Sequence, residues 1–131
     1  MKVTVDTNVL VRAVVGDDPA QSRAAAEILS QAELIAVTLP CLCEFVWVLR
    51  KVYGFQVSDI AAAIRVLLET GNVEMNRAAV DSGLSILEAG GDFADGVIAF
   101  DGRWLGGETF TSLDKKAVAL LAAQGHPVRL V

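Results

Sequence analysis

Histidine and cysteine are scarce in this 131-residue sequence, which contains one histidine and two cysteines. Cys41 and Cys43 lie two positions apart in an expected helix, a spacing that points their side chains away from each other and predicts reduced thiols. The single histidine, His126, lies in a Gly-His-Pro turn, where a structural role is expected. These few residues do not supply the usual ligands of a zinc site, and they argue against Ser-His-Asp or Cys-His nucleophilic catalysis.

Long hydrophobic runs are also missing. The longest stretch without Asp, Glu, Lys or Arg covers 12 residues, 117–128, and it contains Gln124, Gly125 and Pro127. A membrane-spanning helix needs about 18 or more apolar residues, so no membrane span is expected. No signal peptide is evident, which predicts a cytoplasmic protein. The composition is nevertheless 53% hydrophobic with a mean hydropathy of +0.49, and such surplus apolar surface usually meets a partner.

Basic residues are outnumbered by acidic ones, giving a formal net charge of −5 and a pI of about 4.7. This balance argues against a protein that coats nucleic acid by charge alone. It leaves open an enzyme that gathers acids in one pocket and neutralises them with cations.

Short β-rich runs alternate with helical patterns along the whole chain. We expect strands at residues 2–5, 33–38, 72–76, 108–111 and 128–131. Helical spacing or caps predict helices at 20–31, 39–54, 58–71, 77–91, 92–105 and 114–125, with Asp18 and Ser58 as N-caps and Gly54 and Gly71 at C-termini. Residues 8–15 fit a helix or a strand, and Gly96 and Gly102 lower the helix propensity of 92–105. The alternation predicts one α/β domain over residues 1–131, with about five mostly parallel strands covered by five to seven helices.

Five acids occupy informative places in this pattern. Asp6 and Asp114 follow the first and fourth expected strands, and functional sites of such sheets lie beyond the carboxyl ends of the strands. Glu44 is the only acid between residues 34 and 58 and lies in an apolar helix, six residues from the nearest basic side chain. Asp92 and Asp95 begin another helix, where Asp92 suits the N-cap and Asp95 faces a site.

Carboxylates gathered in one pocket need a counter-charge, because they cannot all stay ionised beside one another. Magnesium or manganese, hard cations that prefer oxygen ligands, would supply it. With no nucleophilic side chain near these acids in the sequence, the metal would generate the nucleophile from bound water, as in phosphodiester hydrolysis.

Four stretches in order, VTVDTNVLVR, LCEFVWVLRKVYG, DFADGVIA and TSLDKKA, resemble the motifs of PIN-domain ribonucleases, most closely the VapC toxins of bacterial toxin–antitoxin pairs. The resemblance covers essentially the whole chain and implies a three-layer PIN-like fold. It assigns the metal-binding, catalytic acids to Asp6, Glu44, Asp95 and Asp114. Four further residues match auxiliary positions: Asp92, Ser112, Thr7 and Asn8.

The resemblance implies a Mg²⁺- or Mn²⁺-dependent endoribonuclease that cleaves structured RNA such as tRNA. It also implies a homodimer that a VapB-type antitoxin holds inactive. Seven basic residues are candidates for contacts with RNA phosphates: Arg12, Arg23, Arg50, Lys51, Arg103, Lys115 and Lys116. Trp47, Tyr53 and Phe55 are candidates to face a partner.

Two other α/β classes with acidic magnesium pockets fit less well. A phospho-acceptor receiver domain needs adjacent acids after the first strand and an acceptor aspartate after the third, where this chain offers only Glu74, Asn76 and Asp81. A haloacid-dehalogenase-like phosphatase needs a second aspartate two residues after the first, and that position is Asn8.

Overall fold

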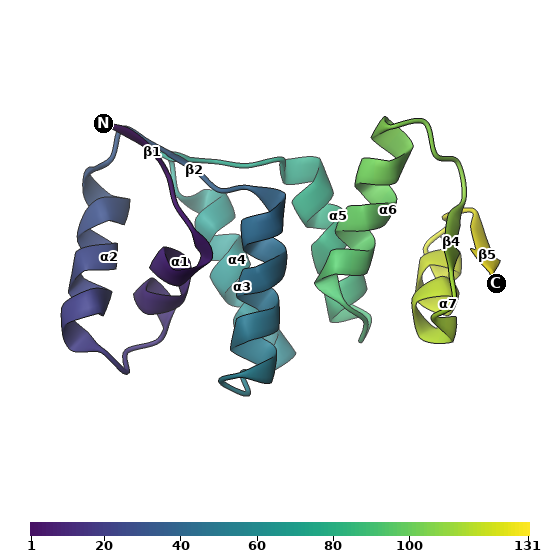
Figure 1. The fold of residues 1–131 in the computed structure, drawn as a ribbon, viewed down its shortest axis with the longest axis horizontal. Helices are drawn as coiled ribbons and strands as arrows, with labels where there is room; N and C mark the ends of the chain where they lie inside the picture. Colours follow the sequence, from purple (N-terminus) through teal and green to yellow (C-terminus); the bar gives the residue numbers. More distant parts are fainter. The chain divides into compact units, whose positions relative to one another are not determined.

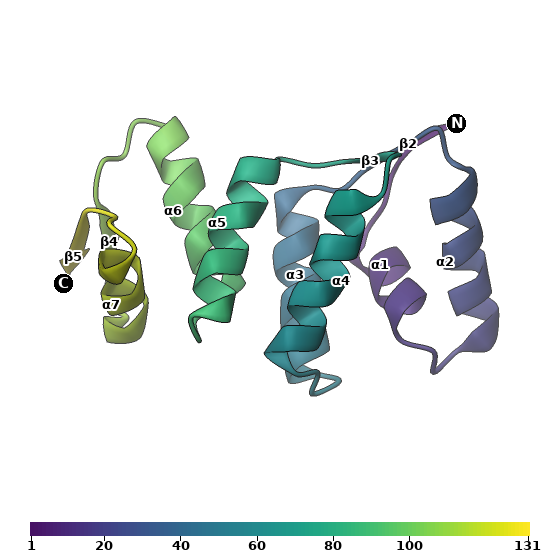
Figure 2. The same ribbon diagram turned by 180° about the vertical axis from the view of Figure 1, so that it is seen from behind.

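A computed structural model describes residues 1–131 and shows parallel strands connected by helices, the expected α/β class (Figures 1 and 2). Five strands and seven helices form, in two compact units, Met1–Asn76 and Arg77–Val131. The prediction of one domain over residues 1–131 stays a prediction. The longest helices have 13 residues, and none has the length and apolar character to cross a bilayer.

The first unit is built on a three-stranded parallel sheet in the order β1-β2-β3. Lys2 lies opposite Leu34 in the β1–β2 pair, and Ile35 lies opposite Val73 in the β2–β3 pair. The elements of this unit are β1 (Lys2–Thr4), α1 (Thr7–Val14), α2 (Pro19–Gln31), β2 (Leu34–Ala36), α3 (Leu39–Lys51), α4 (Val57–Glu69) and β3 (Val73–Glu74). Parallel pairing brings the carboxyl ends of β1 and β2 to one edge, so the residues after β1 lie beside the start of α3.

The core of this unit forms where α1, α3 and α4 cover the sheet. Phe45 and Leu49 of α3 and Ile60 and Ile64 of α4 have no exposed surface, and Leu10 of α1 is 1% exposed. Full burial of such a side chain contributes about 1.5–3 kcal/mol. Helix α1 packs against both α2 and α3, and α3 packs against α4. These contacts fix α1 and α3, the two helices that carry candidate acids.

The second unit contains α5 (Arg77–Glu88), α6 (Phe93–Trp104), β4 (Phe110–Ser112), α7 (Lys115–Ala123) and β5 (Val128–Leu130). Strands β4 and β5 pair in parallel, and α7 packs against both. Ile86, Ala99 and Leu121 form a buried cluster under this pair. A reciprocal pair of hydrogen bonds joins α5 to the end of α7, since Ser85 Oγ donates to Gln124 Oε1 at 2.7 Å and Gln124 Nε2 donates to the Ser85 carbonyl at 3.1 Å.

Several predicted boundaries are wrong by one or two residues. Helix α4 begins at Val57 because the carbonyl of Gln56, not of Ser58, accepts the first helical hydrogen bonds. Helix α3 ends at Lys51 with Val52 as C-cap, and Gly54 forms a separate left-handed turn at φ 69°. Helix α4 likewise ends before Thr70 rather than at Gly71. The fourth strand begins at Phe110, and the ambiguous segment after Asp6 is the helix α1.

Candidate active site

Asp6 is both a helix cap and a candidate ligand. It is the N-cap of α1, where its Oδ1 accepts a hydrogen bond from the Val9 backbone N–H at 3.4 Å. The side chain is exposed, and Oδ2 makes no hydrogen bond or ion pair. The same carboxylate therefore caps α1 and keeps one oxygen free, and its role in a metal site stays a prediction.

Glu44 emerges from the apolar sequence of α3 on its exposed side. Leu42, Phe45 and Val46 around it are buried, whereas Glu44 itself is exposed. No Lys or Arg pairs with it, as its distance along the sequence from Arg50 predicts. An acid held by a rigid helix with no cationic partner is free to bind a cation.

Asp6 and Glu44 lie close to the same thiol. Cys41 of α3 is 7% exposed, and burial raises the pKa of this thiol. A hydrogen bond with Thr7 lowers the pKa, whereas the negative charges of Asp6 and Glu44 raise it further. Burial and these two acids therefore favour the neutral thiol of Cys41. No disulfide joins the two cysteines, and their redox state stays a prediction.

The second unit gathers three more candidate acids. Asp95 lies in the first turn of α6 and is partly buried. Burial raises the pKa of Asp95 above its ordinary value, and the negative charges of Asp92 and Asp114 raise it further. The charges of Asp92 and Asp114 thus oppose the ionisation of Asp95, an effect that a bound cation would offset.

The capping roles within this group differ from the prediction. Asp92 holds the N-cap position of α6, but its side chain makes no capping hydrogen bond. Asp114 instead caps α7, because its Oδ1 accepts hydrogen bonds from the N–H groups of Lys116 at 3.0 Å and Ala117 at 3.1 Å. Ser112 Oγ accepts from the Asp114 N–H at 3.0 Å and so fixes the turn that presents this carboxylate. Asp114, like Asp6, keeps its second oxygen free.

The two remaining auxiliary residues lie beside Asp6 in α1. Thr7 is 7% exposed and faces Cys41, whereas Asn8 is exposed and makes no hydrogen bond through its side chain. A role for Asn8 therefore stays a prediction.

The donor chemistry suits a hard divalent cation. The candidate ligands are carboxylates without a Lys or Arg partner, and the one nearby thiol is kept protonated by burial and by its acidic neighbours. Carboxylate oxygens are the ligands that Mg²⁺ and Mn²⁺ prefer. No group of three or more His, Cys, Asp or Glu side chains lies close enough in the structure to hold an ion.

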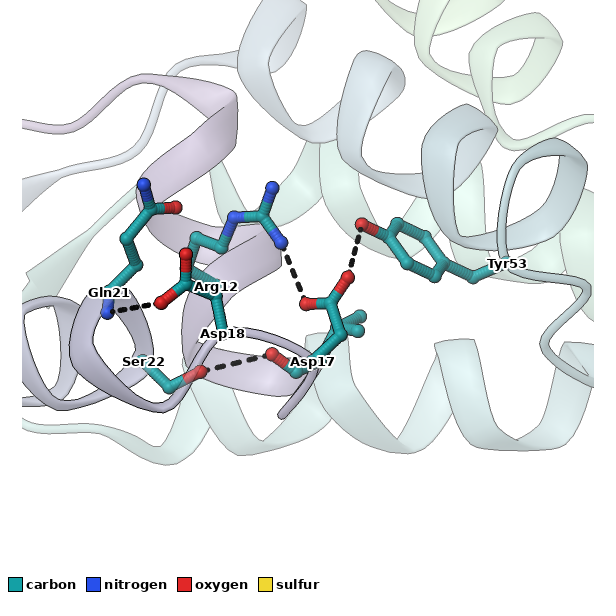
Figure 3. Close-up of polar contacts among 7 residues, drawn as sticks. Arg12, Asp17, Asp18, Gln21, Ser22 and Tyr53 are labelled. Atoms are coloured by element: carbon teal, nitrogen blue, oxygen red, sulfur yellow. Dashed lines mark hydrogen bonds and ion pairs between the residues drawn. The ribbon is translucent and has the colours of Figure 1, made fainter.

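One basic candidate for RNA contacts is already engaged within the first unit (Figure 3). Arg12 Nη1 donates to Asp17 Oδ1 at 2.7 Å, and the hydroxyl of Tyr53 donates to Asp17 Oδ2 at 3.3 Å. Asp17 raises the pKa of Arg12. The same figure shows Asp18 accepting from the Gln21 N–H, the predicted N-cap of α2. Arg12 and Tyr53 thus link the turn before α2 to the end of α3. Of the predicted partner-facing aromatics, Trp47 is 58% exposed, and Tyr53 and Phe55 are partly buried.

Each unit has parallel strands connected by helices, and Asp6, Asp95 and Asp114 lie at the starts of α1, α6 and α7. The PIN-domain family model matches residues 3–119, and the chain belongs to the PIN family. PIN domains are generally metal-dependent nucleases, which makes this chain nuclease-like. No curated protein matches the sequence.

Two contributors to the site were not recognised as such in the sequence. Cys41 precedes Glu44 by three residues and therefore shares its side of α3, a spacing that could have indicated its place beside the acids. Gly96 follows Asp95, and a Cβ there would lie 2.3 Å from the Ser82 carbonyl oxygen. The glycine that lowers helix propensity thus allows α6 to lie directly on α5 next to a candidate ligand.

Proposed function

We propose that this PIN domain is a VapC-like toxin, a Mg²⁺- or Mn²⁺-dependent endoribonuclease that cleaves structured RNA such as tRNA in the cytoplasm. The observation that carries the proposal is the PIN-family match over residues 3–119, which contains all the candidate acids. Asp6, Glu44, Asp92, Asp95 and Asp114 form no ion pair, whereas Asp17 pairs with Arg12.

The family resemblance makes Asp6 and Glu44 of the first unit and Asp95 and Asp114 of the second the candidate metal ligands. When bound, Mg²⁺ or Mn²⁺ lowers the pKa of a coordinated water and stabilises negative charge on a phosphoryl oxygen. Asp6 and Asp114 each use one oxygen to cap a helix, so the helix fixes the orientation of the other oxygen. Ser112 holds the turn before Asp114, and Asp92 adds negative charge beside Asp95.

Carboxylate-to-amide variants test this assignment, because asparagine remains a good helix N-cap. Asp6→Asn and Asp114→Asn should keep the fold and lose metal-dependent cleavage of tRNA. The measurement is the initial cleavage rate at fixed Mn²⁺, with circular dichroism spectra to check the fold.

Asp81→Asn is the matched control, because Asp81 is an exposed acid of α5 outside the candidate set. This variant should cleave at the wild-type rate. Wild-type activity in both Asp6→Asn and Asp114→Asn would remove these residues from the mechanism.

The proposal includes a VapB-type antitoxin as the inhibitory partner and a homodimer as the toxin's own assembly. An apolar groove of about 480 Å³ in the first unit supports a protein partner, and it is lined by residues of α1, α2 and α4 that include Val14, Leu29, Val66 and Leu67. Val14 is 41% exposed and Val66 63% exposed, so a helical apolar segment of an antitoxin would cover surface that is now open to solvent.

A charge placed in the groove tests this partner. Val66→Glu should prevent co-purification with the antitoxin when both are expressed together, while leaving RNA cleavage by the isolated toxin unchanged. Retention of the complex at wild-type yield would show that the antitoxin does not use this groove. Sedimentation velocity of the isolated toxin tests the homodimer, which a single monomeric species at micromolar concentration would contradict.

The receiver-domain alternative loses support from the placement of its acceptor candidates. Met75 and Asn76 follow β3, and Asp81 lies within α5 rather than at a strand end. The first unit therefore presents no aspartate after its third strand.

A further inference from the structure

The exposed side of α3 carries an aromatic ring beside two cations. Trp47 is 58% exposed, whereas Phe45 of the same helix has no exposed surface. Arg50 and Lys51 follow Trp47 by three and four residues, so both are its neighbours on the helix surface, and both are exposed. The side chains of these two cations form no ion pair and no hydrogen bond, unlike that of Arg12. Their charges are therefore available to a ligand.

The same two cations line a cavity at the turn between α3 and α4, two helices that pack against each other (Figures 1 and 2). The cavity has a volume of about 460 Å³, and its lining consists of Arg50, Lys51 and residues 54–58. The Phe55 N–H donates to the Leu49 carbonyl at 2.9 Å and fixes the turn against the end of α3. No acidic side chain lines the cavity, so its charged lining is entirely positive in a chain of net charge −5.

Hydrogen-bonding groups and a ring complete the lining. Gln56 and Ser58 are exposed, and neither side chain makes a hydrogen bond. The partly buried ring of Phe55 meets that of Tyr53 edge to face, with centroids 6.5 Å apart and an interplanar angle of 75°. The Tyr53 hydroxyl in turn donates to Asp17 Oδ2 at 3.3 Å. The aromatic wall of the cavity is therefore held in place.

A single-stranded nucleic acid has the chemistry that matches this surface. Proteins that bind single strands combine cationic side chains along the phosphates with aromatic side chains on which bases stack. A double helix keeps its bases stacked on one another and would offer no base to Trp47. An apolar protein segment would cover Trp47 but would leave Arg50 and Lys51 without partners.

We propose that the exposed side of α3 and the turn 54–58 bind a single-stranded segment of RNA, with a base stacked on Trp47 and phosphates at Arg50 and Lys51. The choice of RNA rests on the proposed ribonuclease, but this binding needs no metal. Glu44 precedes Trp47 by three residues, about 4.5 Å along the axis of α3. A strand bound here therefore leads to a candidate ligand of the first unit, and the substrate class is RNA that presents a single-stranded loop.

Binding of an unstructured oligouridylate of about 12 nucleotides, measured in EDTA, tests the inference without cleavage. Fluorescence anisotropy of the labelled oligonucleotide gives the Kd for the whole chain. Trp47→Ala should raise the Kd about tenfold, as expected for one lost stacking contact, with its salt dependence unchanged. Arg50→Gln/Lys51→Gln should weaken binding and reduce the slope of log Kd against log salt by about 1.4, since each phosphate contact contributes about 0.7. An RNA duplex of the same length should bind more weakly than the oligouridylate.

Matched controls come from the second unit. Trp104→Ala removes the other tryptophan, which is 77% exposed, and Arg77→Gln/Arg129→Gln removes two exposed cations. Both controls should bind as wild type does. Trp47→Phe retains a ring for stacking and should bind within about threefold of wild type. In Trp104→Phe, Trp47 is the only tryptophan, and the oligouridylate should quench its fluorescence.

Several outcomes would overturn the inference. They are wild-type affinity in Trp47→Ala, an equal loss in Trp47→Ala and Trp104→Ala, and equal affinity for the duplex. Trp47→Ala that fails to co-purify with the antitoxin but keeps its RNA affinity would assign this face to a protein partner and would also overturn the inference. Where Trp47→Ala does not fold, the fluorescence of Trp104→Phe and the Arg50→Gln/Lys51→Gln variant decide the outcome.

Wild-type protein distinguishes this failure from failure of the proposed function. Wild type that binds the oligouridylate but cleaves no RNA would overturn the nuclease proposal alone. Wild type that cleaves RNA, together with Trp47→Ala of unchanged RNA affinity, would overturn this inference alone. Wild type that neither binds the oligouridylate nor cleaves RNA would overturn both.

Discussion

Gly96 is the position where the smallest change should have the largest structural effect. An added Cβ would lie 2.3 Å from the Ser82 carbonyl oxygen, 2.7 Å from the Ser82 carbonyl carbon and 2.8 Å from the Gly83 Cα. All three are backbone atoms of α5, so no side-chain rotation can relieve the clash. Gly96→Ala therefore has to separate α5 from α6 by about 1 Å to reach ordinary van der Waals contact, and Asp95 moves with α6.

The expected cost follows from two opposing effects. Overpacking of a close-packed contact costs about 1–3 kcal/mol, and a backbone obstacle places Gly96→Ala at the upper end. The higher helix propensity of alanine returns about 1 kcal/mol. We therefore expect a net loss of about 2 kcal/mol in the free energy of unfolding, or roughly 8 °C in the melting temperature for a chain of this size.

Gly102→Ala is the matched control within the same helix. A Cβ at Gly102 has nothing within 4 Å, so only the gain in helix propensity, about 0.5–1 kcal/mol, remains. Urea unfolding followed by circular dichroism measures both variants. Equal or greater stability of Gly96→Ala than of wild type, or a loss in Gly102→Ala similar to that in Gly96→Ala, would refute the close packing of α5 on α6.

Three further predictions concern charges. Asp95→Asn should raise the metal-free melting temperature at neutral pH, because a carboxyl whose pKa is raised on folding destabilises the folded state when it is ionised. This destabilisation is absent below about pH 3.9, the pKa of an unfolded aspartate, and it develops as the pH rises through the raised pKa of folded Asp95. The gain in melting temperature should therefore vanish in acid. Asp114→Ala should lower stability by about 1 kcal/mol and Asp114→Asn by much less, since asparagine retains the cap of α7. Arg12→Ala should lower the stability only slightly, because its ion pair with Asp17 is partly exposed, and the loss should shrink in high salt. Thermal unfolding scans check all three, and opposite signs would contradict them.

Much of the fold follows from local patterns in the sequence. The Asp18-Pro19 start of α2 and the apolar spacing of α4 act within one helical turn, and both elements form where these signals predict them. Boundaries were less predictable, because Ser58 and Gly54 carry good capping chemistry at positions that backbone hydrogen bonding does not use as caps. Propensity ranks candidate end residues, but the neighbouring packing selects among them.

In the candidate site, too, local sequence signals predict some features and packing decides the others. Asp6 and Asp114 could be predicted as candidates because each follows an expected strand, and the structure makes them the N-caps of α1 and α7. Sequence spacing does not show which acids cap helices through their side chains. Asp92 fits the N-cap pattern, but its side chain makes no capping hydrogen bond. The burial of Thr7 against Cys41 depends on packing between α1 and α3, which no local pattern encodes.

Cleavage of RNA by the purified, partner-free protein is the decisive assay for a metal-dependent ribonuclease. The protein is incubated with total bacterial RNA in Mg²⁺, in Mn²⁺ or in EDTA, and the new 5′ ends are mapped. A metal-dependent PIN ribonuclease should produce a few discrete ends in Mg²⁺ or Mn²⁺ and none in EDTA. Intact RNA in both metals, from protein with a folded circular dichroism spectrum, would contradict the account.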